Sequence, residues 1–293
     1  MKRFIFISFI LLFLASCGKT NETKSSTHKI YTTIYPIHFL VTELVHDDIK
    51  VVTVYPPGVD AHTYEPTIRE MIDIASGDAF FYLGEQLETF TNKAKSALKN
   101  SDVSFIEIGK YEGIFSSDSV DADPHFWFDP LRMIIAANMI SEQLSELYPE
   151  DKQVFQENLN ELTKDLTTLD EQFAKSLAKT DKREIIVSHG AYKYWEERYG
   201  IRQIPISGIT ATDEPSQKEL TNLIQSAKEK NISYVLFEQN ATNKIAEIIQ
   251  EELDAKRLFI HNLEVLVDDD IENEENYFSL MKHNLQQLEK ALQ

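Results

Sequence analysis

Apolar and polar positions alternate along residues 30–148 in a way that predicts strands and helices in turn. Short apolar or β-branched runs predict strands at 29–34, 50–55, 79–83 and 104–108. Between them, apolar residues at helical spacing predict helices at 37–45, 68–76 and 85–98. Because strands that alternate with helices are typical of βαβ units, we expect an N-terminal α/β lobe built around a parallel-rich sheet.

The same alternation begins again after residue 180 and predicts a second lobe. Strands are expected at 184–187, 202–206, 234–238 and 258–260. Helices are expected at 192–199, 216–230, 243–253 and 277–292. Residues 181–293 are therefore predicted to form a C-terminal α/β lobe with helices on its sheet.

Residues 149–180, between the two predicted lobes, carry an uninterrupted helical pattern. After Pro149 this stretch contains neither proline nor glycine. Its apolar residues recur at steps of three and four: Phe155, Leu159, Leu162, Leu166, Leu169, Phe173 and Leu177. A coiled-coil partner could explain this stripe, but a stripe of this length more often packs on its own domain. We expect a rigid helix that joins the lobes.

The amino terminus has the pattern of a signal peptide. Two basic residues precede the apolar run 4–14, which is too short to span a membrane. The run ends in Leu-Ala-Ser-Cys, which resembles a bacterial lipobox with Cys17 as the first mature residue. An ordinary signal peptide with a chance cysteine is the alternative, but Cys17 is the only cysteine of the chain. We expect a signal peptide at 1–16, and a lipid-anchored, flexible tether at 17–29.

Composition narrows the classes of protein and partner. A single cysteine excludes an intrachain disulfide and a site built from several thiolates. The formal net charge of −19 argues against nucleic acid, and against an anionic membrane surface, as partners. Contact with a membrane is therefore expected only through the lipid anchor. We expect the protein to be a monomer.

Residues 123–130 read Asp-Pro-His-Phe-Trp-Phe-Asp-Pro and are the most constrained stretch of the chain. The two prolines favour a stiff, extended backbone, which presents the ring of His125 among three aromatic side chains. Asp123 and Asp129 could each accept a hydrogen bond from its second ring nitrogen. An oriented imidazole in a dry environment with a carboxylate behind it is typical of a metal ligand. The alternative is a histidine in the core.

Three further residues have surroundings that suit a metal ligand. His62 follows a rigid turn, and His189 ends an apolar run that reads as a strand. Glu264 is a carboxylate in an apolar context, which is costly unless it is paired or bound to a cation. Three nitrogens and one oxygen suit a tetrahedral Zn²⁺ site. Since each imidazole must be neutral to bind, zinc affinity is expected to fall below about pH 6.5.

Several stretches together resemble the zinc/manganese class of solute-binding lipoproteins of ABC transporters. They are Pro-Gly-Val-Asp-Ala-His-Thr-Tyr-Glu-Pro at 57–66, the segment 123–130, Ser-His-Gly-Ala-Tyr at 188–192, Thr-Asp-Glu-Pro-Ser at 212–216 and Phe-Glu-Gln-Asn at 237–240. The resemblance covers nearly the whole chain. It implies two α/β lobes joined by a long rigid helix, with the metal in the interlobe cleft.

The resemblance also implies the ligand set His62, His125, His189 and Glu264. Manganese-type members carry a carboxylate where His189 stands, so the chain is similar to the zinc type, and imidazole suits Zn²⁺ better than Mn²⁺. Carboxylates of Glu65, Asp123 and Asp129 are expected to support the site and offset the charge of the ion. The other histidines, apart from His261, are expected to be structural or solvated: His28, His38, His46 and His283.

Two departures from the family pattern bear on the site. Many zinc-type relatives carry a histidine-rich loop before the second ligand, whereas residues 116–123 are acidic and lack histidine. Near Glu264 the usual proline is replaced by Asn262, so that His261 and Asp268 compete with Glu264 as the fourth ligand.

The expected function is capture of Zn²⁺, as cargo, outside the cytoplasmic membrane and its delivery to an ABC permease with its ATPase subunit. A manganese-binding protein of the same class is the first alternative. A zinc hydrolase is the second, because three histidines can hold a catalytic ion with an open fourth position. Only Glu65 and Glu264 are candidates for its general base, so we expect no enzyme. An adhesin or scaffold, whose activity needs none of the ligands, is the third.

Overall fold

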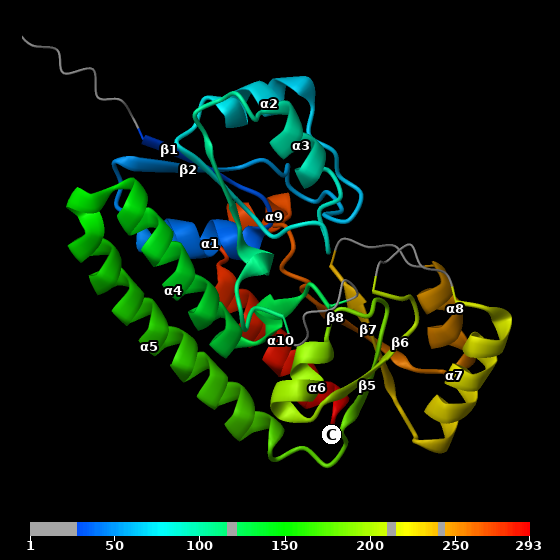
Figure 1. Ribbon diagram of the computed structural model, residues 1–293. Coiled ribbons are helices and arrows are strands. Elements are labelled where there is room, and N and C mark those ends of the chain that lie inside the picture. Colours follow the sequence, from blue (N-terminus) through cyan, green and yellow to red (C-terminus); the bar gives the residue numbers. More distant parts are fainter. Residues whose placement is uncertain (1–27, 116–121, 210–214, 240–243) are drawn as a thin grey trace, which may run out of the picture.

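The computed structural model describes residues 28–115, 122–209, 215–239 and 244–293, which form two α/β lobes (Figure 1). The N-terminal sheet has the strand order β2-β1-β3-β4 and the C-terminal sheet β6-β5-β7-β8, and all neighbouring strands are parallel. The strands are β1 (His28–Thr32), β2 (Ile49–Thr53), β3 (Ala79–Tyr82), β4 (Ser104–Glu107), β5 (Glu184–Val187), β6 (Arg202–Pro205), β7 (Tyr234–Glu238) and β8 (Lys256–Ile260). The predicted fold class is confirmed.

In both sheets the strand order reverses beside the first strand. β1 pairs with β2 on one side and β3 on the other, and β5 likewise lies between β6 and β7. Such a reversal sends the following connections to opposite faces and leaves a crevice at the carboxyl ends of the strands. Segments that follow the strands are therefore the ones positioned to bind a ligand.

Helices cover the sheets and begin at recognisable signals. Thr67 and Ser216 each form a capping box with the glutamate three residues later, and so satisfy free N–H groups at a helix start. The helices, with the short 3₁₀ turns, are α1 (Tyr35–Leu44), α2 (Ile68–Ala75), α3 (Thr91–Ala97), η1 (Ile108–Lys110), η2 (Phe126–Phe128), α4 (Pro130–Leu147), η3 (Pro149–Asp151), α5 (Lys152–Leu177), α6 (Lys193–Tyr199), α7 (Gln217–Glu229), α8 (Lys244–Glu252), α9 (Asp268–Glu272) and α10 (Tyr277–Ala291).

One predicted helix is shorter than its pattern indicated. Residues 85–98 were expected to be helical, but α3 begins only at Thr91. The buried carboxylate of Glu88 accepts hydrogen bonds from the backbone N–H groups of Leu83 (2.8 Å) and Gly84 (3.0 Å). This side chain therefore holds residues 84–88 in a turn, because its hydrogen bonds to the backbone compete with those of a helix. The spacing of apolar residues does not reveal such a competition.

The predicted linking helix is present as α5, which runs along one side of the molecule beside both lobes (Figure 1). All seven apolar residues of its stripe are buried. They face the protein's own helices, since α5 packs against α1, α4, α6 and α10. The largest buried cluster consequently continues from the N-terminal lobe through α4, α5 and α10 to one face of the C-terminal sheet. A smaller cluster lies under α7 and α8 on the opposite face.

No helix within the described ranges is long and apolar enough to cross a membrane. The predicted signal peptide, Cys17 and most of the tether lie outside the described residues. The same holds for most of the acidic segment 116–123 and for parts of the motifs at 212–216 and 237–240.

Candidate metal centre

The four candidate ligands His62, His125, His189 and Glu264 meet in one cluster. One ligand atom from each lies within 4.8 Å of the others. Glu264 Oε1 is 3.5 Å from His62 Nε2 and 3.4 Å from His125 Nε2. Around a tetrahedral zinc ion with bonds of about 2.05 Å, ligand atoms stand roughly 3.3 Å apart. The two distances from Glu264 Oε1 therefore match the spacing around such an ion.

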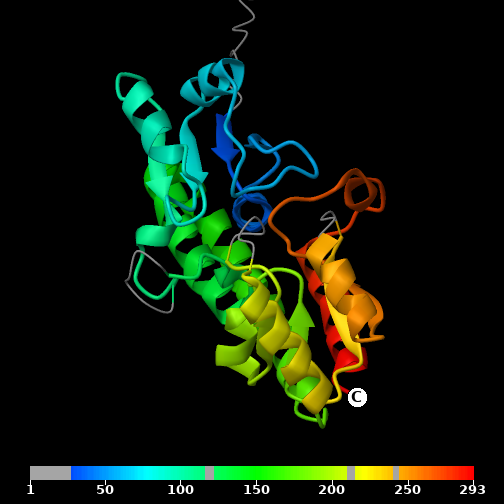
Figure 2. The same ribbon diagram turned by 90° about the vertical axis from the view of Figure 1, so that its right-hand side faces the viewer.

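The ligands of the cluster come from both lobes, which face each other in Figures 1 and 2. His62 comes from the connection after β2 and His125 from the turn that leads into α4. His189 stands two residues after β5, and Glu264 stands four residues after β8. The carboxyl-terminal edges of both sheets thus supply side chains to one site, as the strand order predicts.

Three of the four ligand atoms are buried without a hydrogen-bond partner in the described part of the chain: His62 Nε2, His125 Nε2 and Glu264 Oε1. The four side chains are at most 6% exposed. A buried polar atom without a partner costs free energy, so three of them pointing at one another need a common partner. A cation that accepts nitrogen and oxygen donors meets this need, and the donor set suits zinc.

His125 is held by the aspartate two residues before it. Asp123 Oδ1 accepts hydrogen bonds from His125 Nδ1 (2.7 Å) and from the His125 backbone N–H (2.9 Å). These contacts fix the ring so that Nε2 faces the cluster. Burial on its own lowers the pKa of the His125 imidazole, but the charge and hydrogen bond of Asp123, together with the nearby Glu264, outweigh burial and raise this pKa above its usual value.

His189 has a carboxylate on one side and a carbonyl on the other. Its Nδ1 lies 2.9 Å from Glu238 Oε1, and its Nε2 lies 2.5 Å from the backbone oxygen of Ile209. Burial lowers the pKa of His189, yet Glu238 opposes burial and raises the pKa to about 9. With both ring nitrogens facing acceptors, the metal-free imidazole holds two protons.

Glu264 is ionised despite its burial. Burial alone raises the pKa of this carboxyl group, but the neighbouring imidazoles of His125 and His62 hold the pKa far below its ordinary value. The backbone N–H of Tyr35 donates to the Glu264 carbonyl (2.8 Å) and fixes this segment against α1 of the other lobe. The cluster therefore offers a cation one negative charge.

Of the three carboxylates expected to support the site, only Asp123 contacts a cluster histidine. Asp129 instead caps α4, because its carboxylate accepts from the free N–H of Leu131 (2.9 Å) at the helix start. Glu65 faces solvent and pairs with Lys93 at 3.2 Å.

Sequence reasoning missed Glu238 as the partner of His189. Its position at the end of the apolar strand β7 was the available signal, and the Phe-Glu-Gln-Asn stretch contained it without a role. The Tyr192 hydroxyl also donates to this carboxylate, at 3.1 Å. Glu238 thus supports His189 in the way that Asp123 supports His125.

The local competitors for the fourth ligand lie outside the cluster. His261 Nε2 is bonded to Asp270 at 2.9 Å, and Asp268 is exposed at the start of α9. The remaining histidines each contact a protein group away from the cluster: His28 with Asp78, His38 with Thr32, His46 with Asp151 and His283 with the Phe259 carbonyl.

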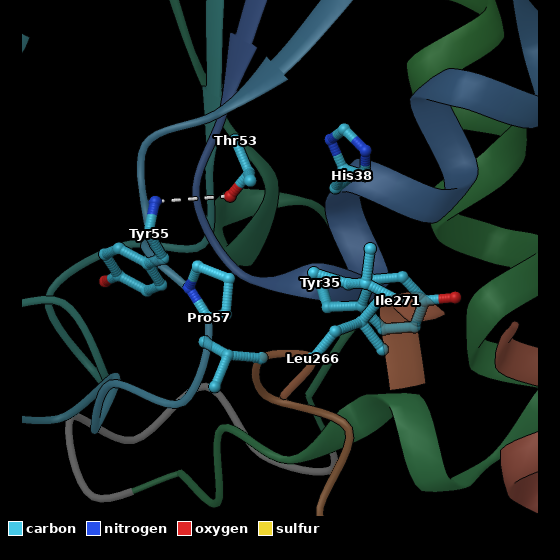
Figure 3. A pocket seen from close by; sticks show the side chains of 8 residues that line it. Tyr35, His38, Thr53, Tyr55, Pro57, Leu266 and Ile271 are labelled. Carbon is cyan, nitrogen blue, oxygen red and sulfur yellow. Dashed lines mark hydrogen bonds between the residues drawn. The ribbon is translucent and has the colours of Figure 1, made fainter. Parts of the chain in front are cut away.

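A cavity of about 200 Å³ lies behind the segment that carries Glu264 (Figure 3). Val265 and Leu266, which follow Glu264, form one side of it. The rest is lined by Tyr35, His38, Thr53, Tyr55, Pro57 and Ile271. Its mainly apolar wall does not suit a cation, so the cavity is separate from the candidate metal centre.

Two α/β lobes with a buried ligand cluster between them define a solute-binding protein of the bilobed class. The chain belongs to the ZnuA family, described as zinc-uptake complex component A, periplasmic, whose model matches residues 30–291. The family resemblance drawn from the sequence motifs is therefore confirmed.

The chain is similar to the zinc-binding lipoprotein AdcA of Streptococcus pneumoniae R6, with 29% identity over 97% of this chain and 59% of that protein. It thus spans less than two thirds of that relative. The high-affinity zinc uptake system protein ZnuA of Bacillus subtilis 168 is 28% identical over 98% of this chain and 96% of its own length. The crystal structure of the Zn(II)-bound ZnuA-like domain of pneumococcal AdcA superposes with a TM-score of 0.79 at 30% identity, over 91% and 99% of the two chains.

Proposed function

We propose that this protein captures Zn²⁺ outside the cytoplasmic membrane and delivers it to an ABC-type metal permease. The observation that carries this proposal is the buried cluster of three imidazoles and one carboxylate, in which three ligand atoms lack a hydrogen-bond partner among the described residues. The zinc-related names of the relatives support the choice of metal. The permease and its ATPase subunit are the proposed partners, and the protein is proposed to act as a monomer.

Binding is favoured over hydrolysis by the closure of the site. A catalytic zinc keeps one position open for water, whereas a closed site has four protein ligands. Here four candidate ligands converge with side chains that are almost fully buried. Glu65, the other carboxylate considered as a general base, faces solvent beside Lys93. We therefore propose that the protein binds zinc without a catalytic activity.

Metal competition tests the proposed function. The purified protein is expected to bind one Zn²⁺ per chain and to prefer Zn²⁺ over Mn²⁺ at every pH, because Mn²⁺ favours more oxygen ligands than this cluster offers. Equilibrium dialysis with both ions, followed by elemental analysis, measures the preference. Manganese bound as tightly as zinc would instead favour the manganese-binding alternative. Hydrolysis of ester, peptide or phosphoester substrates by the zinc-loaded protein would favour the hydrolase.

We propose that the protein is anchored on the extracytoplasmic face of the membrane through a lipid on Cys17. Cys17 lies outside the described residues, and the support comes from the lipobox and from the name lipoprotein carried by a relative. Cys17→Ser is expected to abolish lipidation and leave the signal peptide uncleaved. Detergent phase separation measures the change, with Ser25→Ala in the tether as the control. Normal maturation and membrane partitioning of Cys17→Ser would exclude this anchor.

A further inference from the structure

The backbone just before Glu264 has an unfavourable conformation. Four non-glycine residues of the described ranges have positive φ, and Leu263 (φ 61°) is the one among them that is buried. The left-handed region is costly for a bulky side chain and persists only where surrounding contacts hold it. Because Leu263 directly precedes Glu264, the contacts that hold Leu263 also set the direction of the Glu264 carboxylate.

His261 supplies these contacts. Its Nδ1 accepts a hydrogen bond from the Leu263 backbone N–H at 2.9 Å, so its ring proton is on Nε2. Nε2 lies 2.9 Å from Asp270 Oδ2, which also accepts from the Val267 N–H at 2.8 Å. The imidazole thus closes a loop from residue 261 to residue 270, with Glu264 inside it.

The His261 backbone is fixed in turn by α10. Asn284 Oδ1 accepts from the His261 N–H at 2.7 Å, and Asn284 Nδ2 donates to the His261 carbonyl at 2.8 Å. His261 is 4% exposed and Asn284 is fully buried, so water does not compete for these groups. The ring is therefore attached to a rigid element and not to a surface loop.

Asn262 connects the same segment to the partner of His189. Its Oδ1 accepts from the Glu264 N–H at 3.2 Å, and its Nδ2 donates to Glu238 Oε2, also at 3.2 Å. The Trp127 indole donates to the Asn262 carbonyl at 2.9 Å, from the segment that carries His125. Movement of residues 261–264 would thus disturb the supports of several candidate ligands together.

We propose that His261 is a positioning residue for zinc: its Nδ1 holds Leu263 in the left-handed conformation and thereby places the Glu264 carboxylate at the ion. The inference rests on the proposed function, since it assigns a role within the same site. His261 does not touch the metal in this role. The role is distinct from that of a competing fourth ligand, because both of its ring nitrogens already have protein partners.

Two isosteric substitutions separate the two ring nitrogens. In His261→Asn the side-chain oxygen occupies the position of Nδ1 and can still accept from Leu263. In His261→Gln the amide nitrogen occupies the position of Nε2 and can still donate to Asp270, but Leu263 loses its acceptor. His261→Gln is expected to weaken zinc binding about 10- to 100-fold, the usual effect of losing an outer contact of a metal ligand. His261→Asn is expected to remain within about threefold of the wild type.

A double-mutant cycle with Glu264→Ala distinguishes positioning from general damage. If His261 acts through Glu264, His261→Gln has no further effect on the residual zinc affinity of Glu264→Ala. Chelator competition gives the affinities, and thermal unfolding of the metal-free proteins reports structural damage separately. Equal weakening in both backgrounds, or unchanged affinity of His261→Gln, overturns the positioning role. A wild-type protein that binds no zinc overturns the proposed function itself.

Discussion

Replacing His125 with alanine is expected to reduce zinc affinity by roughly 100- to 1,000-fold. A structural zinc site with four protein ligands gains about 10–16 kcal/mol, so one ligand accounts for about 2.5–4 kcal/mol, and 1.4 kcal/mol is a factor of ten. The ring is fully buried and fixed by Asp123 on its far side. Among the described residues, no other histidine or carboxylate belongs to the cluster and could replace Nε2, and water would have to enter a buried site.

Chelator-competition titration of the purified variant measures this loss. His283→Ala is the matched control, because His283 is exposed and bonded to the Phe259 carbonyl away from the cluster. It is expected to bind zinc as the wild type does. Glu264→Ala is expected to lose less than His125→Ala, since water can supply an oxygen ligand more readily than a nitrogen ligand. Unchanged zinc stoichiometry and affinity in His125→Ala would exclude the proposed site.

Features with a local cause could be predicted from the sequence. The stripe of α5 follows from helical spacing, and all its apolar members are buried. Asp123 lies two residues before His125, so the stiff Asp-Pro-His segment brings the two together within one turn. The candidate ligands also carried local signals, since each stands at the end of a strand or beside a rigid turn.

Features that depend on distant contacts could not be predicted. Glu238 contacts His189, 49 residues away in sequence, because β5 and β7 are neighbours in the sheet. The sequence of neither strand indicates which strands are neighbours. Asp129 had the same local appearance as Asp123, but the free N–H groups of α4 bind it instead. Helix α4 itself was not predicted, although its buried residues recur at helical spacing, because its pattern begins directly after the aromatic segment.

Zinc binding is expected to release protons at neutral pH, and zinc affinity is expected to rise with pH up to about 9. In the metal-free protein Glu238, acting against burial, raises the pKa of His189 to about 9, and Asp123 raises the pKa of His125. At pH 7 the His189 ring therefore carries a proton on the nitrogen that faces Ile209, and zinc must displace it. The pH range over which zinc affinity changes therefore extends above the value of about 6.5 expected for unperturbed imidazoles.

The sign and the size of this effect follow from competition between zinc and protons. A proton that is bound below the raised pKa and absent above it weakens zinc binding about tenfold for each pH unit below that pKa. For one proton on His189, affinity is expected to fall at least about 100-fold from pH 8 to pH 6, and more steeply where His125 also gains a proton. Titration calorimetry near pH 7.5 in buffers of different ionisation enthalpy counts the protons released.

Glu238→Gln provides the matched variant for this measurement. A neutral amide keeps a hydrogen-bonding oxygen near His189 Nδ1 but removes the charge that opposes burial, so the pKa of His189 is expected to fall. Proton release at pH 7.5 should then decrease, and the rise of affinity with pH should end at a lower pH. A zinc affinity that is flat between about pH 5 and 8 in the wild type, or equal proton release by both proteins, would contradict the assignment of this proton to His189.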